Sequence, residues 1–343
     1  MKYFILITLV MITACAPSAA EMQSLTVIVH DSFSISETVA RQFEQANNAK
    51  LIFLKSGDAG TMLNKAILTK DAPLADVLYG VDNTFLSRAL EAGIFERTSL
   101  AIPDSIPSEF MTGAVPDAFP IDYADVCINY DKRYFSKNLL SVPTSLEQLQ
   151  DPSYKGLLVV EDPNTSSPGL AFMLATQVHF REAWLEYWQS LLENKVVIVD
   201  SWETAYYTNF SGSSGHGAQP LVVSYATSPA AEVIFADPPV DATPTGSIIG
   251  PETCFRQIEY VGIMKGTPQR DMAEKFIQFL LSEPFQEDIA LQMFVFPVLP
   301  GAELPEAFVK YAERVEDPAT LTPGEIMSNR DTWLEEWSQV MGR

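Results

Sequence analysis

The chain has 343 residues, of which 47% are hydrophobic and 11% aromatic, so it has enough apolar material for a large packed core and is not a disordered chain. Its formal net charge of -22 disfavours binding to nucleic acid or to an anionic lipid surface. The same charge is compatible with simple solubility outside the cell and with a field that attracts cationic ligands. We therefore expect one large or two lobed domains and no nucleic-acid partner.

Residues 1–20 have the pattern of an export signal. Lys2 precedes an apolar run that is too short to span a bilayer. The run ends in Ile-Thr-Ala-Cys at Cys15, which resembles a bacterial lipobox, in which the cysteine becomes the lipid-modified first residue of the mature chain. Cleavage near Ala20 is the alternative. We expect a periplasmic protein, or one on the outer face of the cytoplasmic membrane, held by lipid on Cys15 and not by a spanning helix.

Beyond Cys15 the chain has two cysteines, Cys127 and Cys254. No Cys-x-x-Cys pair exists, which excludes a zinc ribbon and a thioredoxin-like redox motif. An oxidising compartment allows the two remaining cysteines to pair.

Residues 25–93 alternate between short apolar runs and helical patterns. Val39, Ala40 and Phe43 have the spacing of one helix face, and Gly93 is a helix stop signal. Strands alternating with helices predict a parallel, doubly wound sheet. The predicted strands are 25–30, 50–56 and 73–80, and the predicted helices are 37–47, 59–70 and 84–93.

The same alternation resumes after the segment 119–132. Thr144 and Glu147 have the spacing of a capping box at the start of the next short helix. The pattern predicts a second α/β lobe over about residues 126–256. Its predicted strands are 156–162, 194–200 and 220–226, and its predicted helices open within 162–172 and span 181–195.

The C-terminal part continues with a strand and two helical patterns. Residues 257–266 are strand-like, and 270–292 repeat apolar residues on one broad helical face. Thr322 and Glu325 form a second capping-box pattern, with Pro323 at the first position of the last helix.

Several motifs together resemble the thiamine-binding solute receptors of bacterial ABC importers. The most specific pieces are DPNTSSPGL at 162–170 and SYATSP at 224–229. The resemblance extends from residue 25 to the C-terminus and includes LTVIVHDSF, LADVLYGVDN, PIDYADVCINYDK, SWETAYY and DTWLEEWSQVM.

The resemblance implies an α/β, two-lobed, periplasmic-binding-protein-like (type II) fold with two hinge crossovers. The crossings fall near residues 122–126 and 259–262, beside Cys127 and Cys254, so a disulfide between the hinge strands is left open. Lobe one would comprise residues 21–125 and 260–300, and lobe two residues 126–259 and 301–343.

The implied function is an extracytoplasmic receptor, monomeric and without a cofactor, that binds thiamine or a thiamine phosphate between the lobes and delivers it to a membrane permease. Such a ligand requires flat π-faces for its rings and cation, an acceptor for its amino group and donors for its hydroxyethyl or phosphate arm.

The resemblance assigns aromatic faces to Trp202 and Tyr225, and Phe294 stands where relatives have a tryptophan. Asp58, followed by Ala59, stands where relatives place an acid facing the pyrimidine, although an aspartate before a helix also serves as an N-cap.

Further site residues follow from the hinge and from the start of a helix. Tyr123 matches the hinge tyrosine, and Tyr206 belongs to the SWETAYY motif. The first N–H groups of a helix are free and carry the positive end of its dipole, so the helix mouth predicts a pocket for an anion or hydroxyl group, with a plain helix cap as the alternative. The residues of this mouth are Thr165, Ser166, Ser167 and Gly169.

Three positions depart from the family pattern by losing an aromatic side chain. His30 and Ala231 stand where relatives have tyrosine, and Asp125 replaces a second aromatic residue after the hinge tyrosine. His30 keeps a flat ring that can stack on a ligand.

Other function classes have less support. The common hydrolase, metalloprotease and nucleotide-binding motifs are absent, and the three histidines, His30, His179 and His216, do not suggest a triad, so we expect no catalysis. A ferric-iron receptor is the closest alternative, because Tyr206 and Tyr207 are adjacent and His30 precedes an aspartate. A polyamine receptor is a further one. We expect no resident metal.

Overall fold

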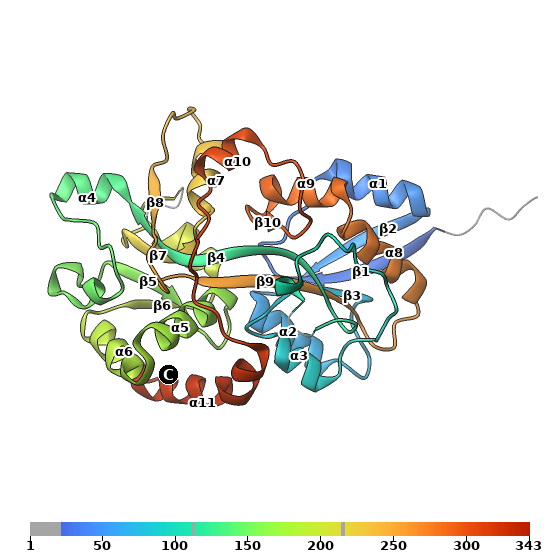
Figure 1. The fold of residues 1–343 in the computed structure, drawn as a ribbon, viewed down its shortest axis with the longest axis horizontal. Coiled ribbons are helices and arrows are strands. Elements are labelled where there is room, and N and C mark those ends of the chain that lie inside the picture. The colour runs from blue at the N-terminus through green and yellow to red at the C-terminus, as the bar shows by residue number, and fades with distance from the viewer. Residues whose placement is uncertain (1–21, 112–113, 214–216) are drawn as a thin grey trace, which may run out of the picture.

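The computed structural model describes residues 22–111, 114–213 and 217–343, so the lipobox cysteine Cys15 and His216 lie outside the described residues. Within these residues a single ten-stranded sheet has the order β2-β1-β3-β9-β4-β7-β5-β6, with β8 and β10 pairing with β4 (Figure 1). The strands are β1 Gln23–Val29, β2 Ala49–Lys55, β3 Val77–Asp82, β4 Phe119–Asp131, β5 Leu158–Glu161, β6 Val197–Val199, β7 Leu221–Tyr225, β8 Thr245–Ile248, β9 Phe255–Ile263 and β10 Phe296–Pro297.

Helices flank the sheet on both sides, as the alternating pattern predicts (Figure 1). Their buried stripes, such as Val39 and Phe43 in the first helix, cover the sheet, and Gly93 ends the third helix in the left-handed conformation. The helices are α1 Glu37–Asn47, α2 Ala59–Leu68, α3 Leu86–Ala92, α4 Lys132–Asn138, α5 Ser167–Phe180, α6 Trp184–Glu193, α7 Ser228–Ile234, α8 Arg270–Leu280, α9 Glu283–Gln292, α10 Glu306–Tyr311 and α11 Pro323–Met341.

The sheet has two parallel blocks joined by two long antiparallel strands. β1 pairs in parallel with β2 and β3, and β5 pairs in parallel with β6 and β7. β4 and β9 run across the centre between the blocks (Figure 1). We call β1–β3 with α1–α3, α8 and α9 lobe one, β5–β8 with α4–α7 lobe two, and β4 and β9 the hinge strands. The prediction of a two-lobed α/β fold with two crossovers is confirmed.

Two local predictions differ from the structure. The pattern over 270–292 is two helices, because Pro284 cannot donate an intrahelical hydrogen bond and lies in the first turn of α9. The capping box of Thr144 and Glu147 is wrong: the Thr144 N–H donates to Gln148, and the Glu147 carboxylate lies 2.7 Å from His179 Nε2. The capping box of Thr322 and Glu325 is present.

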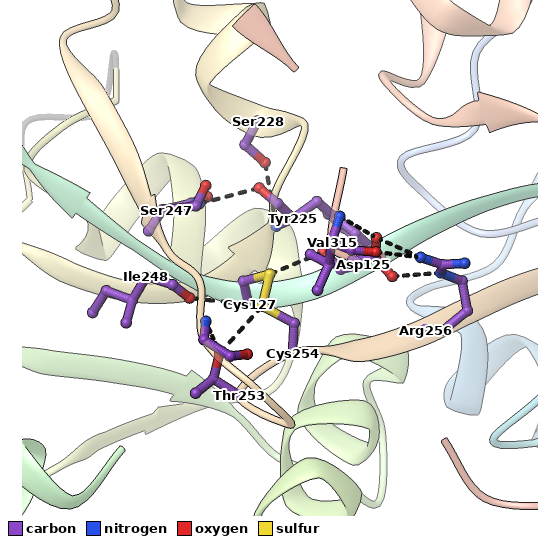
Figure 2. Close-up of a disulfide and its surroundings, with 12 residues drawn as sticks. Asp125, Cys127, Tyr225, Ser228, Ser247, Ile248, Thr253, Cys254, Arg256 and Val315 are labelled. Carbon is purple, nitrogen blue, oxygen red and sulfur yellow. Dashed lines mark hydrogen bonds and ion pairs between the residues drawn. A yellow bond between two sulfur atoms is a disulfide. The ribbon is translucent and has the colours of Figure 1, made fainter. Parts of the chain in front are cut away.

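The hinge strands are cross-linked where they enter lobe two. Cys127 of β4 and Cys254, directly before β9, form a disulfide with their Cα atoms 4.4 Å apart, which resolves the pairing that the sequence leaves open (Figure 2). Beside it, Asp125 accepts hydrogen bonds from Arg256 at 2.5 and 3.1 Å and from the Val315 N–H at 3.3 Å. This end of the hinge is therefore held by one covalent bond and one buried ion pair.

The C-terminal helix α11 packs on both lobes, since it contacts α6 of lobe two and α3 of lobe one. Its end is fixed by Arg343, which lies 2.8 Å from Asp162 at the start of the α5 region. In the described part of the chain no helix combines the length and the apolar character needed to cross a bilayer.

Candidate ligand-binding site

A cavity of about 270 Å³ lies between the lobes, at the carboxyl ends of β1, β2 and β7 and against the hinge strands. This is where open α/β sheets place their ligands, because loops of both halves converge at the same edge. Most of the predicted site residues line it, namely His30, Asp58, Ala59, Ser167, Trp202, Tyr206, Tyr225 and Phe294. Tyr123, Thr165, Ser166 and Gly169 are not among its lining residues.

Aromatic side chains of lobe two form one wall of the cavity. The rings of Trp202 and Tyr206 are stacked 5.0 Å apart at 18°, and the ring of Tyr225 lies 6.1 Å from Trp202. The Trp202 indole N–H donates to Ser224 at 2.9 Å, which fixes the orientation of the ring. Trp202 and Tyr225 are neither fully buried nor fully exposed, so their faces border the cavity without being sealed inside the core.

A second aromatic group lies at the rim. Phe294 follows α9 of lobe one, and its ring is 5.3 Å from that of Phe235, which follows α7 of lobe two. Phe235 is 70% exposed and lies one helical turn beyond Ala231, so both side chains project from the same side of α7 into the cavity lining. Phe235 therefore supplies an aromatic face one helical turn from Ala231.

Asp58 joins the lobes across the cavity. It is the N-cap of α2, and its Oδ1 accepts from the Ala59 N–H at 2.7 Å. Its Oδ2 accepts from the Trp202 N–H at 3.0 Å, which belongs to lobe two. Asp58 is therefore both the N-cap of α2 and a residue that lines the cavity, the two roles that the sequence leaves open.

The mouth of α5 faces lobe one, and of its predicted site residues Ser167 also lines the cavity. The Ser167 hydroxyl donates to the buried carboxylate of Asp82, and burial, offset in part by this hydrogen bond, raises the pKa of Asp82 to about 6. Ser166 is fully buried as the N-cap, and the Thr165 hydroxyl donates to the Asp200 carbonyl at 2.8 Å.

Two close approaches fix the position of this helix start. A Cβ atom on Gly169 would lie 2.7 Å from the Glu161 carbonyl oxygen, so Gly169 allows α5 to pack against β5. A Cβ atom on Gly60 would lie 2.7 Å from the Thr165 carbonyl oxygen, so the backbones of the two lobes touch here. The two lobes are therefore closed on each other in this structure.

Residues of β4 alternate between the cavity and the opposite face of the sheet. Asp122 and Ala124 line the cavity, whereas Tyr123 stacks on Phe110 and Phe296 at 4.8 and 5.4 Å on the other side. Asp125 pairs with Arg256 and also does not line the cavity.

The floor of the cavity is an acidic cluster on the hinge strands. Asp122 Oδ2 accepts from the Tyr79 hydroxyl at 2.5 Å, and Glu259 Oε1 lies 3.3 Å from His30 Nε2. Burial lowers the pKa of His30, but the charge of Glu259 and a hydrogen bond to it outweigh burial, so the pKa is raised. His30 is thus an ion-pair partner at the floor of the cavity and packs on Gly80.

Some lining residues were missed from the sequence. The hinge strands contain polar residues between apolar ones, namely Asp122, Gln257 and Glu259. Polar residues in buried strands indicate a site, here one that is lined by both hinge strands. Phe235 had a signal as well, because it is four residues after Ala231 on a helix. Lys55 and Glu203 gave no distinguishing pattern.

A metal centre finds no matching geometry in this part of the molecule. Among the described residues no group of three or more His, Cys, Asp or Glu side chains is placed to hold a metal ion. The Tyr206 hydroxyl donates to Glu232 at 2.9 Å, and the rings of Tyr206 and Tyr207 are nearly perpendicular, so the two phenols do not converge on one point.

Comparisons with known proteins agree with the fold. Residues 72–316 match the model of the bacterial extracellular solute-binding protein family. The thiamine-binding periplasmic protein of Escherichia coli (strain K12) is 30% identical over 328 residues, which cover 93% of this chain and 94% of that protein. The protein of the same name from Salmonella typhimurium is 30% identical over 338 residues, 96% of this chain and 97% of that protein.

A solved periplasmic thiamin binding protein has the same fold. It superimposes with a TM-score of 0.80 at 26% identity, covering 96% of this chain and 100% of that chain. The family match spans both lobes and the hinge strands described above. The chain belongs to the bacterial extracellular solute-binding proteins.

Proposed function

We propose that this receptor binds thiamine, or a thiamine phosphate, in the cavity between its lobes and delivers it to the membrane permease of an ABC importer. The observation that carries the proposal is the combination of an aromatic wall, Trp202, Tyr206 and Tyr225, with the buried carboxyl groups of Asp122 and Glu259. The relatives at 30% identity, which cover almost the whole chain, are named for thiamine binding and support the same ligand.

The chemistry of the two cavity walls suits a flat organic cation. Aromatic faces attract a cation through their quadrupoles, with a contribution of about 2 kcal/mol when the contact excludes water. Asp31, Asp58 and Glu203 line the cavity in addition to the two carboxyl groups of the floor, so a positive ligand is favoured over a neutral one of the same shape.

Closure couples binding to transport by a population shift. The ligand contacts lobe one and lobe two together only in the closed form, and the Asp58–Trp202 and Asp82–Ser167 hydrogen bonds also require that form. A ligand that bridges the walls stabilises the closed state in proportion to its preference for that state over the open one. The permease then recognises the closed receptor.

The finer parts of the proposal concern anchoring and domain boundaries. We propose a monomer that acts as a binder and not as an enzyme, held outside the cytoplasmic membrane by lipid on Cys15. We further propose that lobe one comprises residues 21–125 and 260–300, and lobe two 126–259 and 301–343, with the bend on the lobe-one side of the disulfide.

A polyamine is the second candidate, because five carboxyl-bearing residues line the cavity and a linear polycation would satisfy several at once. These residues are Asp31, Asp58, Asp122, Glu203 and Glu259. A ferric ion is the weaker alternative, since Tyr206 and Tyr207 do not converge.

Isothermal titration of the purified mature protein with thiamine, thiamine monophosphate, thiamine diphosphate, spermidine and ferric ion tests the proposal. We expect one site per chain and the tightest binding with a thiamine form. Saturable binding heat with spermidine alone would show that the ligand is a polyamine and not thiamine. The absence of heat with any thiamine form would overturn the proposal.

A further inference from the structure

Asp122 and Glu259 lie opposite each other on the two hinge strands at the floor of the cavity. The antiparallel register of β4 and β9 pairs Asp122 with Glu259 and Ala124 with Gln257, and all four residues line the cavity. Asp122 is fully buried and Glu259 is 6% exposed. Two carboxylates in such a position repel each other and are poorly solvated. His30 offsets the charge of Glu259, so a proton or a further cation must compensate the second carboxylate.

Only part of the hydrogen-bonding capacity of these groups is used. Asp122 Oδ2 accepts from the Tyr79 hydroxyl, and Glu259 Oε1 lies beside His30 Nε2. In the described part of the chain, Asp122 Oδ1 and Glu259 Oε2 have no hydrogen-bond donor from another residue. Two buried acceptor atoms thus remain for a proton or for a donor that enters the cavity.

The titration of Asp122 supports a shared proton. Burial raises the pKa of Asp122 well above its usual range, and the negative charge of Glu259 acts in the same direction. Two buried carboxyl groups that face each other from paired strand positions favour a state in which one of them holds a proton. Other ionisable groups also interact electrostatically with this pair or with His30, the partner of Glu259. They are Lys55, Asp58, Tyr79, Asp82 and Tyr225.

Asp58 is less suited to receive the amino group of a ligand. Its Oδ1 already accepts from the Ala59 N–H at the start of α2, and its Oδ2 accepts from the Trp202 N–H across the lobes. Asp122 Oδ1 and Glu259 Oε2, the buried carboxyl oxygens without a donor described above, therefore lie on the hinge strands, which belong to neither lobe alone.

We propose that Asp122 and Glu259 share one proton in the free receptor and release it to solvent when a cationic ligand donates a hydrogen bond from its amino group to this pair. The inference rests on the proposed binding of a thiamine form and identifies the residues that read its amino group. The incoming positive charge and N–H donor favour the doubly ionised pair, so binding and proton release are linked. The affinity consequently rises with pH over the range in which Asp122 titrates in the free receptor.

Proton release is measured by titrating the receptor with thiamine in phosphate and in Tris at the same pH and ionic strength. The two buffers take up a proton with different enthalpies, so a released proton makes the observed heats differ. For the wild-type protein we expect such a difference, and an affinity at least about 10-fold higher for thiamine than for the analogue in which oxygen replaces the pyrimidine amino group.

Two variants keep the shape of the pair but prevent the release. Asp122→Asn and Glu259→Gln each place a fixed N–H donor where the ligand requires an acceptor. We expect about 10-fold weaker thiamine binding, the same heat in both buffers and a smaller preference over the oxygen analogue. Glu91→Gln, at an exposed position on α3, changes the net charge equally and should retain wild-type affinity and buffer dependence. Thermal unfolding verifies that each variant is folded. If only one of the two carboxyl variants folds, that variant alone is enough for the test.

The outcomes separate this inference from the proposed function. Absence of thiamine binding by the wild-type protein would refute the function itself. Tight binding with equal heats in both buffers, together with unchanged affinity in Glu259→Gln or Asp122→Asn, would overturn the inference and leave the function standing.

Discussion

The two lobes contribute different chemistry to the same cavity. Lobe two supplies most of the aromatic surface, through Trp202, Tyr206, Tyr207, Tyr225 and Phe235. Lobe one and the hinge strands supply most of the charge, through His30, Asp31, Lys55, Asp58, Asp122 and Glu259. Flat faces select the shape of a ligand and carboxyl groups select its sign, so neither lobe alone can select a flat cation. Specificity therefore depends on closure.

The largest expected effect concerns the disulfide between the two hinge strands. Replacing both hinge cysteines, as Cys127→Ala with Cys254→Ala, should lower the free energy of unfolding by about 2 to 5 kcal/mol, because the bond closes a long loop in the unfolded chain. Chemical denaturation with and without reductant measures it. Neither cysteine lines the cavity, so the thiamine affinity of the folded variant should remain within a few-fold. If the fully folded variant binds thiamine much more weakly, the disulfide also determines the geometry of the binding site.

On the aromatic side, Trp202→Ala should weaken thiamine binding about 100-fold, since it removes a desolvated cation–π face and the stacking partner of Tyr206. Trp202→Phe keeps a flat face but loses the indole donor to Ser224, and should lie between the two. Calorimetry measures both. Equal affinities for wild type and Trp202→Ala would show that the aromatic wall of lobe two does not contribute to ligand binding.

On the charged side, Asp58→Asn should weaken binding about 10-fold while leaving stability nearly unchanged, because asparagine is also a good N-cap. Asp58→Ala removes charge and cap together, and should in addition cost about 1 kcal/mol of stability. Calorimetry and thermal unfolding of the pair separate the two roles. If Asp58→Asn binds as tightly as wild type, Asp58 serves the fold and the lobe contact only.

The smallest effect is expected at the rim, where the lobes mix their contributions. Phe235→Ala should weaken binding by about 3- to 5-fold, since the side chain is largely exposed and its contact with Phe294 forms only on closure. Phe235→Tyr is the matched control and should retain the wild-type value. An accelerated release of ligand in stopped-flow fluorescence would locate the effect in the closed state, and an unchanged rate would contradict it.

The helix mouth illustrates where reasoning from the sequence stopped. The run Thr165, Ser166, Ser167 predicts a helix start, and α5 does begin there. The run alone does not decide its use as a pocket: Ser167 lines the cavity, and its hydroxyl donates to Asp82 of the other lobe, 85 residues earlier in the chain. A local pattern fixes the N–H groups and hydroxyls of a helix start, but it contains no information about which distant side chain faces them.

Local periodicity was sufficient for the strands and helices of the two alternating blocks, since burial of one face imposes a repeat on the sequence, but it did not predict α4, α7, α10, β8 or β10. The resemblance to a receptor family added the hinge crossings and the aromatic residues Trp202 and Tyr225. Only the tertiary structure decided that Tyr123 points away from the cavity and that Asp122 meets Glu259, because strand register places side chains on one face or the other and a shift of one residue reverses them.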